Sequence, residues 1–188
     1  MDRTGLDELL RRARQRDADA LGRLVELYSP RVFGLVYRLA GSRDAAEDLL
    51  QETFLRVVRV IGEYEHVGKF EAWLFRIAAN LARDRARKRQ RRGEGGVHDD
   101  ANGATSARPA PAVADEPAQA LERREAGERL AAGLQRLPDA DREIILLRHY
   151  SELSFREIAD LLHVPLGTAL ARAHRALQRL RRELSAEE

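Results

Sequence analysis

A stretch of 25 residues that is nearly free of large apolar side chains divides this chain in two. Residues 93–117 are rich in Gly, Ala, Pro and Asp, and Val97 and Val113 are their only sizeable apolar side chains. Such a segment buries too little surface to offset the entropy cost of ordering it. We therefore expect a flexible linker between two domains, residues 1–92 and 118–188, each with a small core of its own.

Helical periodicity dominates both flanking segments. In the N-terminal segment, apolar residues recur at the three- and four-residue spacings of one helix face. These residues are Leu50, Phe54, Val57, Ile61, and again Phe70, Leu74, Ile77 and Leu81. Asp44 with Glu47 and Ser154 with Glu157 have the spacing of capping boxes, and Pro30 suits the first turn of a helix. No stretch sustains the period-two alternation of a strand, so the prediction is all-α: two small helical domains joined by the linker.

The segment 69–92 carries nine basic side chains against two acidic ones, a net charge of +7. Cations and one amide form a stripe at helical spacing, rotated about 120° from the apolar stripe of the same helix. This stripe comprises Arg76, Asn80, Arg83 and Arg87, with Lys88 beside it. Guanidinium groups suit phosphates and an asparagine reads base edges, so this helix is predicted to bind nucleic acid. A solvated helix end is the alternative.

Trp73 precedes this stripe by about one helical turn. An indole at that place is suited to stack on an unpaired base. Packing in the domain core is the alternative for this residue.

The C-terminal segment has the sequence form of a helix-turn-helix. A short helix from Ser154 to Leu162 precedes a Val-Pro break, and a long helix follows from Leu166. The long helix is predicted to pack through the apolar stripe Leu166, Leu170, Ala173, Leu177, Leu180 and Leu184. Its nearly opposite stripe is Thr168, Arg172, Arg175, Arg179 and Arg182, with His174 among them. We expect this second helix to enter the major groove of DNA; the exposed basic face of an ordinary bundle is the alternative.

Residues 43–52 carry four acidic side chains and one arginine, a net charge of −3. DNA repels such a helix, so we expect it to face a basic protein surface through Asp48 and Gln51, beside Phe54. A solvated acidic face near a helix N-terminus is the alternative.

Several classes of protein are excluded. The chain has no cysteine, and its five histidines lack metal-ligand spacing, so we expect no disulfide, no metal and no cofactor. No nucleophile–base pair and no phosphate-binding glycine loop is present, so we expect no enzyme. The N-terminus lacks the apolar core of a signal peptide, and no run approaches a membrane span. The expectation is a protein of the cytoplasm.

These motifs together resemble the sigma-70 family of RNA polymerase sigma factors, specifically its extracytoplasmic-function (ECF) group. The stretches that carry the resemblance are residues 44–54, 70–80, 137–142 and 154–168, in this order around a linker. The resemblance implies a factor that directs core polymerase to specific promoters and promotes DNA melting. It implies that residues 1–92 bind the −10 element and the polymerase, and that residues 118–188 bind the −35 element.

The resemblance also gives each candidate residue a role. The −10 element is expected to meet Trp73, Arg76, Asn80, Arg83, Arg87 and Lys88. The −35 element is expected to meet Thr168, Arg172, His174, Arg175 and Arg179. The clamp helices of core polymerase are expected to meet Asp48, Gln51 and Phe54. The resemblance also implies a further partner, an anti-sigma protein that sequesters the factor.

One departure from the family pattern lies in the recognition helix. Where the family usually reads Gly-Thr-Val-Lys-Ser-Arg, this chain reads Gly-Thr-Ala-Leu-Ala-Arg at 167–172. Leu170 and Ala171 thus replace a cation and a hydroxyl, and −35 recognition is expected to be altered unless Leu170 packs in the core. Two other functions are alternatives for the chain. One is a helix-turn-helix regulator that binds operators as a dimer, and the other is a helical interaction protein without a DNA role.

Overall fold

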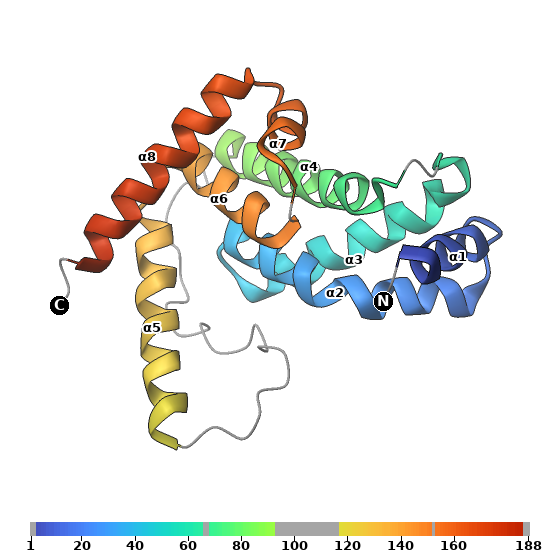
Figure 1. The fold of residues 1–188 in the computed structure, drawn as a ribbon, viewed down its shortest axis with the longest axis horizontal. Helices are drawn as coiled ribbons and strands as arrows, with labels where there is room; N and C mark the ends of the chain where they lie inside the picture. Colours follow the sequence, from blue (N-terminus) through green and yellow to red (C-terminus); the bar gives the residue numbers. More distant parts are fainter. Residues whose placement is uncertain (1–2, 66–67, 93–116, 152, 186–188) are drawn as a thin grey trace. The chain divides into compact units, whose positions relative to one another are not determined.

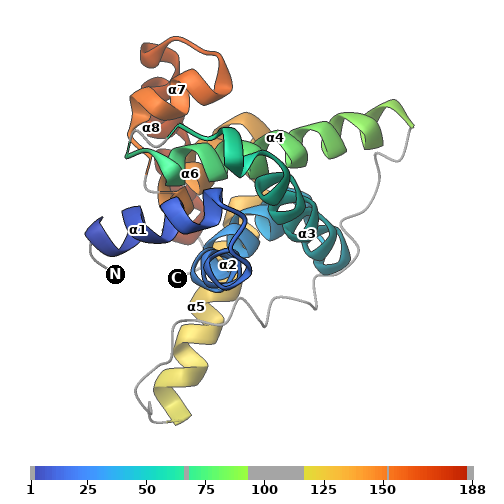
Figure 2. The same cartoon turned by 90° about the vertical axis from the view of Figure 1, so that its right-hand side faces the viewer.

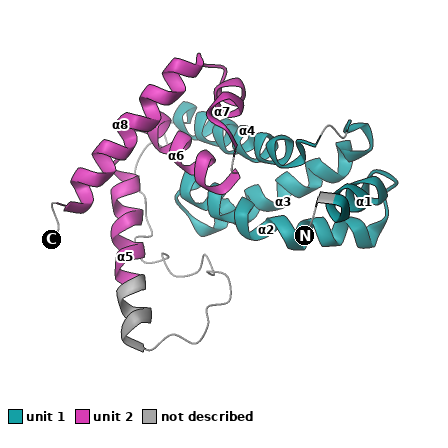
Figure 3. Cartoon of the chain, in the orientation of Figure 1, with its two compact units in different colours: residues 1–99 teal, residues 100–188 magenta. Residues whose placement is uncertain are grey.

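The structure, a computed structural model, describes residues 3–65, 68–92, 117–151 and 153–185, and at residues 3 and 117–123 it describes the backbone alone. All regular secondary structure in these ranges is helical, which confirms the predicted all-α class. The chain forms two compact units, Met1–Asp99 and Asp100–Glu188 (Figures 1 and 3). The predicted linker lies outside the described residues except for Pro117, which begins a helix.

Unit 1 is a helical bundle with a short 3-10 helix. Its described elements are α1 (Arg3–Arg14), α2 (Ala18–Ala40), α3 (Arg43–Val60), η1 (Ile61–Glu63) and α4 (Phe70–Arg91). The three long helices α2, α3 and α4 pack against one another, and α4 lies beside α3 in both views (Figures 1 and 2). The N-terminal helix α1 packs against α2 and η1.

Two helix boundaries in unit 1 differ from those predicted. Ser42 rather than Asp44 caps α3, because its hydroxyl accepts a hydrogen bond from the Ala45 amide at 3.4 Å. Pro30 lies inside α2 and not in a first turn. A proline within a helix removes one backbone donor, but the residues around it, Tyr28 and Val32, are buried in the core and hold the helix in place.

The core of unit 1 forms where α4 meets its two neighbours. Leu74 and Phe75 of α4 and Leu35 of α2 are fully buried. Ala78 and Ala79 follow them on the buried side of α4, and such small side chains let the helix axes approach closely. This packing fixes the rotation of α4 about its axis and therefore decides which of its side chains face outward.

Unit 2 contains the predicted helix-turn-helix. Its helices are α5 (Pro117–Gln135), α6 (Asp139–Ser151), α7 (Phe155–Leu162) and α8 (Leu166–Ser185). The capping box predicted at Ser154 and Glu157 is present at the start of α7. Both α6 and α7 pack on α8, and α5 approaches α8 so closely that a Cβ added at Gly133 would lie 2.9 Å from Leu180.

The turn between α7 and α8 is held by its backbone. His163 adopts a left-handed backbone conformation (φ 54°), which residues other than glycine seldom adopt. The amide of the next residue, Val164, donates to the Ala159 carbonyl at 3.0 Å. This hydrogen bond and the conformation of His163 close the end of α7 and set the direction in which α8 begins.

The face through which α8 packs overlaps the predicted stripe in part. Its buried residues are Ala169, Ala173, Ala176 and Leu180, of which Ala173 and Leu180 belong to the predicted stripe. Three residues of the predicted apolar stripe are exposed instead: Leu166 by 37%, Leu170 by 45% and Leu177 by 55%. The reason is close packing: alanines allow α6 and α7 to approach the helix axis, and the leucines are thereby rotated toward solvent.

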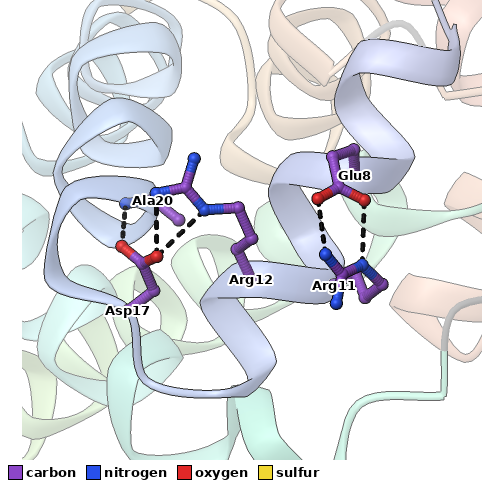
Figure 4. Close-up of polar contacts among 5 residues, drawn as sticks. All are labelled: Glu8, Arg11, Arg12, Asp17 and Ala20. Carbon is purple, nitrogen blue, oxygen red and sulfur yellow. Dashed lines mark hydrogen bonds and ion pairs between the residues drawn. The ribbon is translucent and has the colours of Figure 1, made fainter.

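The corner between α1 and α2 is built around one carboxylate (Figure 4). One oxygen of Asp17 accepts from the Ala20 amide at 3.0 Å and caps α2. The other oxygen accepts from the Arg12 guanidinium at 2.8 and 2.9 Å. These hydrogen bonds, the one from Ala20 first, hold the pKa of the Asp17 carboxyl below its ordinary value.

We expect the Asp17→Asn variant to lose the stability that this carboxylate provides at neutral pH. Because the folded-state pKa is depressed, the contribution is complete above the unfolded-state value of about 3.9 and disappears as the pH falls through the folded-state value. Urea unfolding should therefore show the variant and the wild type converging between about pH 5 and pH 2. Glu26→Gln, which removes an exposed carboxylate from the same helix, is the control. A difference that stays constant over this range would contradict the assignment.

Candidate nucleic-acid interfaces

The cationic stripe predicted on α4 lies on its outer side. Arg76, Asn80, Arg87 and Lys88 are exposed, and Arg83 is half-buried. An Arg83 N–H group donates to the amide oxygen of Asn80 at 2.7 Å, which orients the asparagine side chain. Both N–H groups of the Asn80 amide remain to meet hydrogen-bond acceptors.

Most charge of this stripe is not neutralised. Arg76 and Lys88 form no ion pair with any residue that the structure describes. Arg87 lies 3.8 Å from an oxygen of Asp84, one turn earlier on the same helix, and this exposed pair is weak. The outer side of α4 therefore keeps the positive charge that a phosphate backbone requires.

Trp73 belongs to an aromatic cluster at the start of α4. Its ring centroid lies 4.7 Å from that of Tyr64 and 5.7 Å from that of Phe70. Tyr28 completes the cluster from α2, 5.4 Å from Phe70. Burial raises the pKa of the Tyr64 hydroxyl. Trp73 itself is half-buried, so the structure combines the two sequence interpretations: one side of the indole packs and the rest remains exposed.

A network that the sequence patterns did not reveal anchors the first turn of α4. The Glu71 carboxylate accepts from both terminal nitrogens of Arg31, at 3.0 and 3.2 Å, and from the Tyr28 hydroxyl at 3.3 Å. Burial, followed by the nearby Glu71 charge, raises the pKa of that hydroxyl well above its ordinary value, so it stays protonated. The Arg31 guanidinium also lies 5.3 Å from the centre of the Phe75 ring. Together these contacts fix α4 to α2.

The acidic face of α3 presents two of its three predicted residues. Asp48 and Gln51 are exposed, whereas Phe54 is only 9% exposed and packs in the core. Phe54 thus packs toward the bundle, as its place in the apolar stripe with Val57 predicted, and its role in polymerase docking stays a prediction. Leu55, one position later, is the exposed apolar side chain of this face.

A groove of about 1050 Å³ runs between α3 and α4. Its α3 wall includes Asp48, Gln51 and Leu55, and its α4 wall includes Arg85 and Lys88. The walls are bridged where an N–H group of Arg85 donates to the Asp48 carboxylate at 3.1 Å. An apolar residue between carboxylates and cations gives this groove the mixed character of a protein-binding surface.

The recognition helix α8 places its five predicted residues differently from one another. His174 and Arg175 are exposed, and Thr168 and Arg172 are half-buried at the edge of the packed face. The His174 ring lies 2.9 Å from the Gln178 amide nitrogen. Arg179 lies 3.5 Å from the buried Asp141 carboxylate of α6. This contact links α8 to α6, and because the Arg179 side chain remains exposed, its role at DNA stays a prediction.

The described residues hold no cluster of three or more His, Asp and Glu side chains placed to bind a metal ion. None of the helices in the described ranges has the length and apolar character needed to cross a membrane.

Comparison with known proteins finds sigma factors. Residues 24–92 match the pattern of sigma-70 region 2, and residues 127–180 match that of sigma-70 region 4. The chain is 33% identical over 180 residues to the ECF RNA polymerase sigma factor SigW of Bacillus subtilis, covering 93% of this chain and 94% of SigW. It is 37% identical over 172 residues to the RNA polymerase sigma factor CarQ of Myxococcus xanthus, covering 92% and 93%.

Solved structures with the same fold include a sigma factor. CnrH, solved with the cytosolic domain of CnrY, has a TM-score of 0.66 at 23% identity, covering 96% of this chain and 97% of CnrH. RpoE of Bartonella quintana, solved with the anti-sigma factor NepR, has a TM-score of 0.68 at 24% identity, covering 89% and 98%. At these identities the likeness concerns the fold.

Proposed function

This chain belongs to the extracytoplasmic-function (ECF) group of the sigma-70 family, and from this premise we propose a binding function for each of its two units. The chain is accordingly an RNA polymerase sigma factor that acts in promoter-specific transcription initiation. Residues 1–92 bind core polymerase and the −10 element, and residues 118–188 bind the −35 element. Residues 93–117 connect the two domains.

The observation that carries this division is the separation of charge. On unit 1, the exposed Arg76 and Arg87 of α4 lie outside the groove that Asp48 and Gln51 of α3 line, although Lys88 lies at its wall. On unit 2, the described part of the chain from His163 to Arg182 contains five arginines and no acidic residue. Cationic surfaces suit phosphates and an acidic one suits a basic protein, so each surface is assigned to a different partner.

In unit 1, the −10 element meets the outer side of α4. Arg76 and Lys88 contact phosphates, and the oriented amide of Asn80 contacts a base edge. The exposed part of Trp73 stacks on a base that has left the duplex. The acidic face of α3, through Asp48 and Gln51, docks on the clamp helices of core polymerase.

In unit 2, α8 enters the major groove as the second helix of a helix-turn-helix. Arg175 lies in its outward face and supplies the principal cation, while Thr168, Arg172 and His174 lie around it. Binding at the second promoter element follows binding at the first at a raised effective concentration, since one chain carries both domains.

The factor acts by binding and not by catalysis, and it works in the cytoplasm, where core polymerase is found. The similar proteins CnrH and RpoE were each solved with a bound protein, CnrY and NepR respectively. We propose that an anti-sigma protein likewise sequesters this chain and covers its polymerase-binding and DNA-binding surfaces.

The test is transcription by purified core polymerase with the full-length chain, on templates with and without the −35 element. Arg175→Ala is expected to reduce the stimulation that this element provides by about ten-fold, the cost of one lost arginine contact to DNA. Arg181→Ala, which removes an exposed arginine nearly two turns farther along α8, is the matched control and should retain the stimulation. Equal transcription from both templates with the wild-type chain would refute the assignment of unit 2.

A further inference from the structure

Leu170 occupies an unusual place on the recognition helix. It lies in the second turn of α8 and is 45% exposed, although the sequence periodicity places it in the packed stripe. Ala171 beside it is exposed as well. The part of the helix that leads into the groove therefore presents two neighbouring aliphatic side chains without any hydrogen-bonding group.

Leu170 does not belong to the buried face through which α8 packs within unit 2. The buried face of α8 consists of Ala169, Ala173, Ala176 and Leu180 and does not include Leu170. At about 100° per residue, Leu170 projects roughly 60° from Ala173, toward the outward face. Its side chain is thus available to a molecule that approaches the start of α8.

The surrounding charge identifies that molecule as DNA. Arg172 and Arg175 lie within five positions of Leu170, and neither forms an ion pair with a residue that the structure describes. These cations attract a phosphate backbone, and the proposed function places DNA at this end of α8. The aliphatic side chain then lies among base edges, where the only apolar group in the major groove is the methyl of thymine.

We propose that Leu170, with Ala171 beside it, selects a thymine in the −35 element through contact with the thymine methyl group. Cytosine at the same position is rejected, because its amino group would lose water against Leu170 without gaining a hydrogen-bond acceptor. This inference rests on the proposed function, in which α8 binds the −35 element.

The experiment begins with a promoter that wild-type holoenzyme selects from a library with a randomised −35 region. Each thymine of that region is then replaced singly by deoxyuridine, which removes only the methyl group, and promoter binding by holoenzyme is measured. Wild-type protein is expected to lose about 4-fold in affinity at one position, the effect of one buried methyl group. Leu170→Ala is expected to bind the thymine and deoxyuridine templates equally. Leu177→Ala, which trims an exposed leucine two turns farther along, should still show the loss.

Two outcomes overturn the inference, and they are distinguishable. If deletion of the whole −35 region leaves wild-type binding unchanged, the proposed function of unit 2 fails and the inference fails with it. If binding depends on the −35 region and on Arg175 but no deoxyuridine substitution matters, or if Leu170→Ala keeps the methyl dependence, the inference alone fails.

Discussion

The Asp48→Arg variant is expected to lose transcription activity almost completely. Asp48 is exposed on the acidic face of α3, and the proposed partner of this face is a basic surface. Reversing its charge places two cations opposite each other in the interface, which costs several kcal/mol, so binding to core polymerase should weaken by about 100-fold or more. Competition with a labelled sigma factor for core polymerase measures this affinity directly.

The control for this variant is Glu26→Arg. It reverses an exposed charge on α2, outside the groove, and so changes the net charge of the chain by the same amount. Asp48→Arg also removes the ion pair with Arg85, but this pair is solvent-exposed and contributes at most about 1 kcal/mol. Unfolding midpoints should therefore stay close to that of the wild type. Equal core affinity of Asp48→Arg and Glu26→Arg would show that polymerase docks elsewhere.

The second large effect is expected for Asn80→Ala in open-complex formation. The amide of Asn80 is exposed and oriented by Arg83, and the proposal places it at a base edge of the −10 element. Loss of such a contact costs about 1–3 kcal/mol, so the population of open complex should fall by about ten-fold or more. Permanganate reactivity of unpaired thymines measures that population, and affinity for core polymerase should be unchanged.

Gln90→Ala is the matched control, because it removes another exposed amide from the same helix. A template with a pre-opened −10 region separates two roles for Asn80. If Asn80 only assists strand separation, the variant recovers on this template; if it reads a base of the separated strand, the defect persists. Unchanged permanganate reactivity on the duplex template would remove Asn80 from the −10 surface.

Local sequence patterns predicted much of the fold because their physical causes are local. The capping box at Ser154 and Glu157 satisfies backbone groups within a single turn, so its spacing is sufficient to recognise it. The apolar and cationic stripes of α4 lie on different sides of one helix, and burial of Leu74 leaves Arg76 and Asn80 outside. Roles in DNA binding and polymerase docking remain predictions.

The rotation of α8 was not predictable from periodicity. The predicted stripe and the buried face of this helix share Ala173 and Leu180. Their other members have similar helical spacing, and hydrophobicity favours the leucines over the alanines. Close approach of α6 and α7 favours the alanines, which is a property of the packed unit and not of the helix alone. Phe54 is the opposite case, because the apolar stripe that it forms with Val57 and Ile61 indicated which side of α3 is covered.

Contacts between distant residues were missed for a related reason. Arg179 meets Asp141 of another helix, and Glu71 meets Tyr28 and Arg31 across the bundle. Such pairs have no fixed sequence separation, so no spacing rule signals them. A glutamate in the first turn of a helix is common for electrostatic reasons, and this concealed the anchoring role of Glu71.

The closed backbone of the turn at His163 has a consequence for the thermodynamics of promoter binding. With Val164 bonded back to Ala159 and α8 packed on α6 and α7, the recognition helix is already folded before any DNA arrives. Association then requires little ordering of this helix, so the free energy of binding reflects contacts rather than folding. The logarithmic dependence of affinity on salt concentration should accordingly count the phosphates that unit 2 neutralises, without a contribution from helix formation.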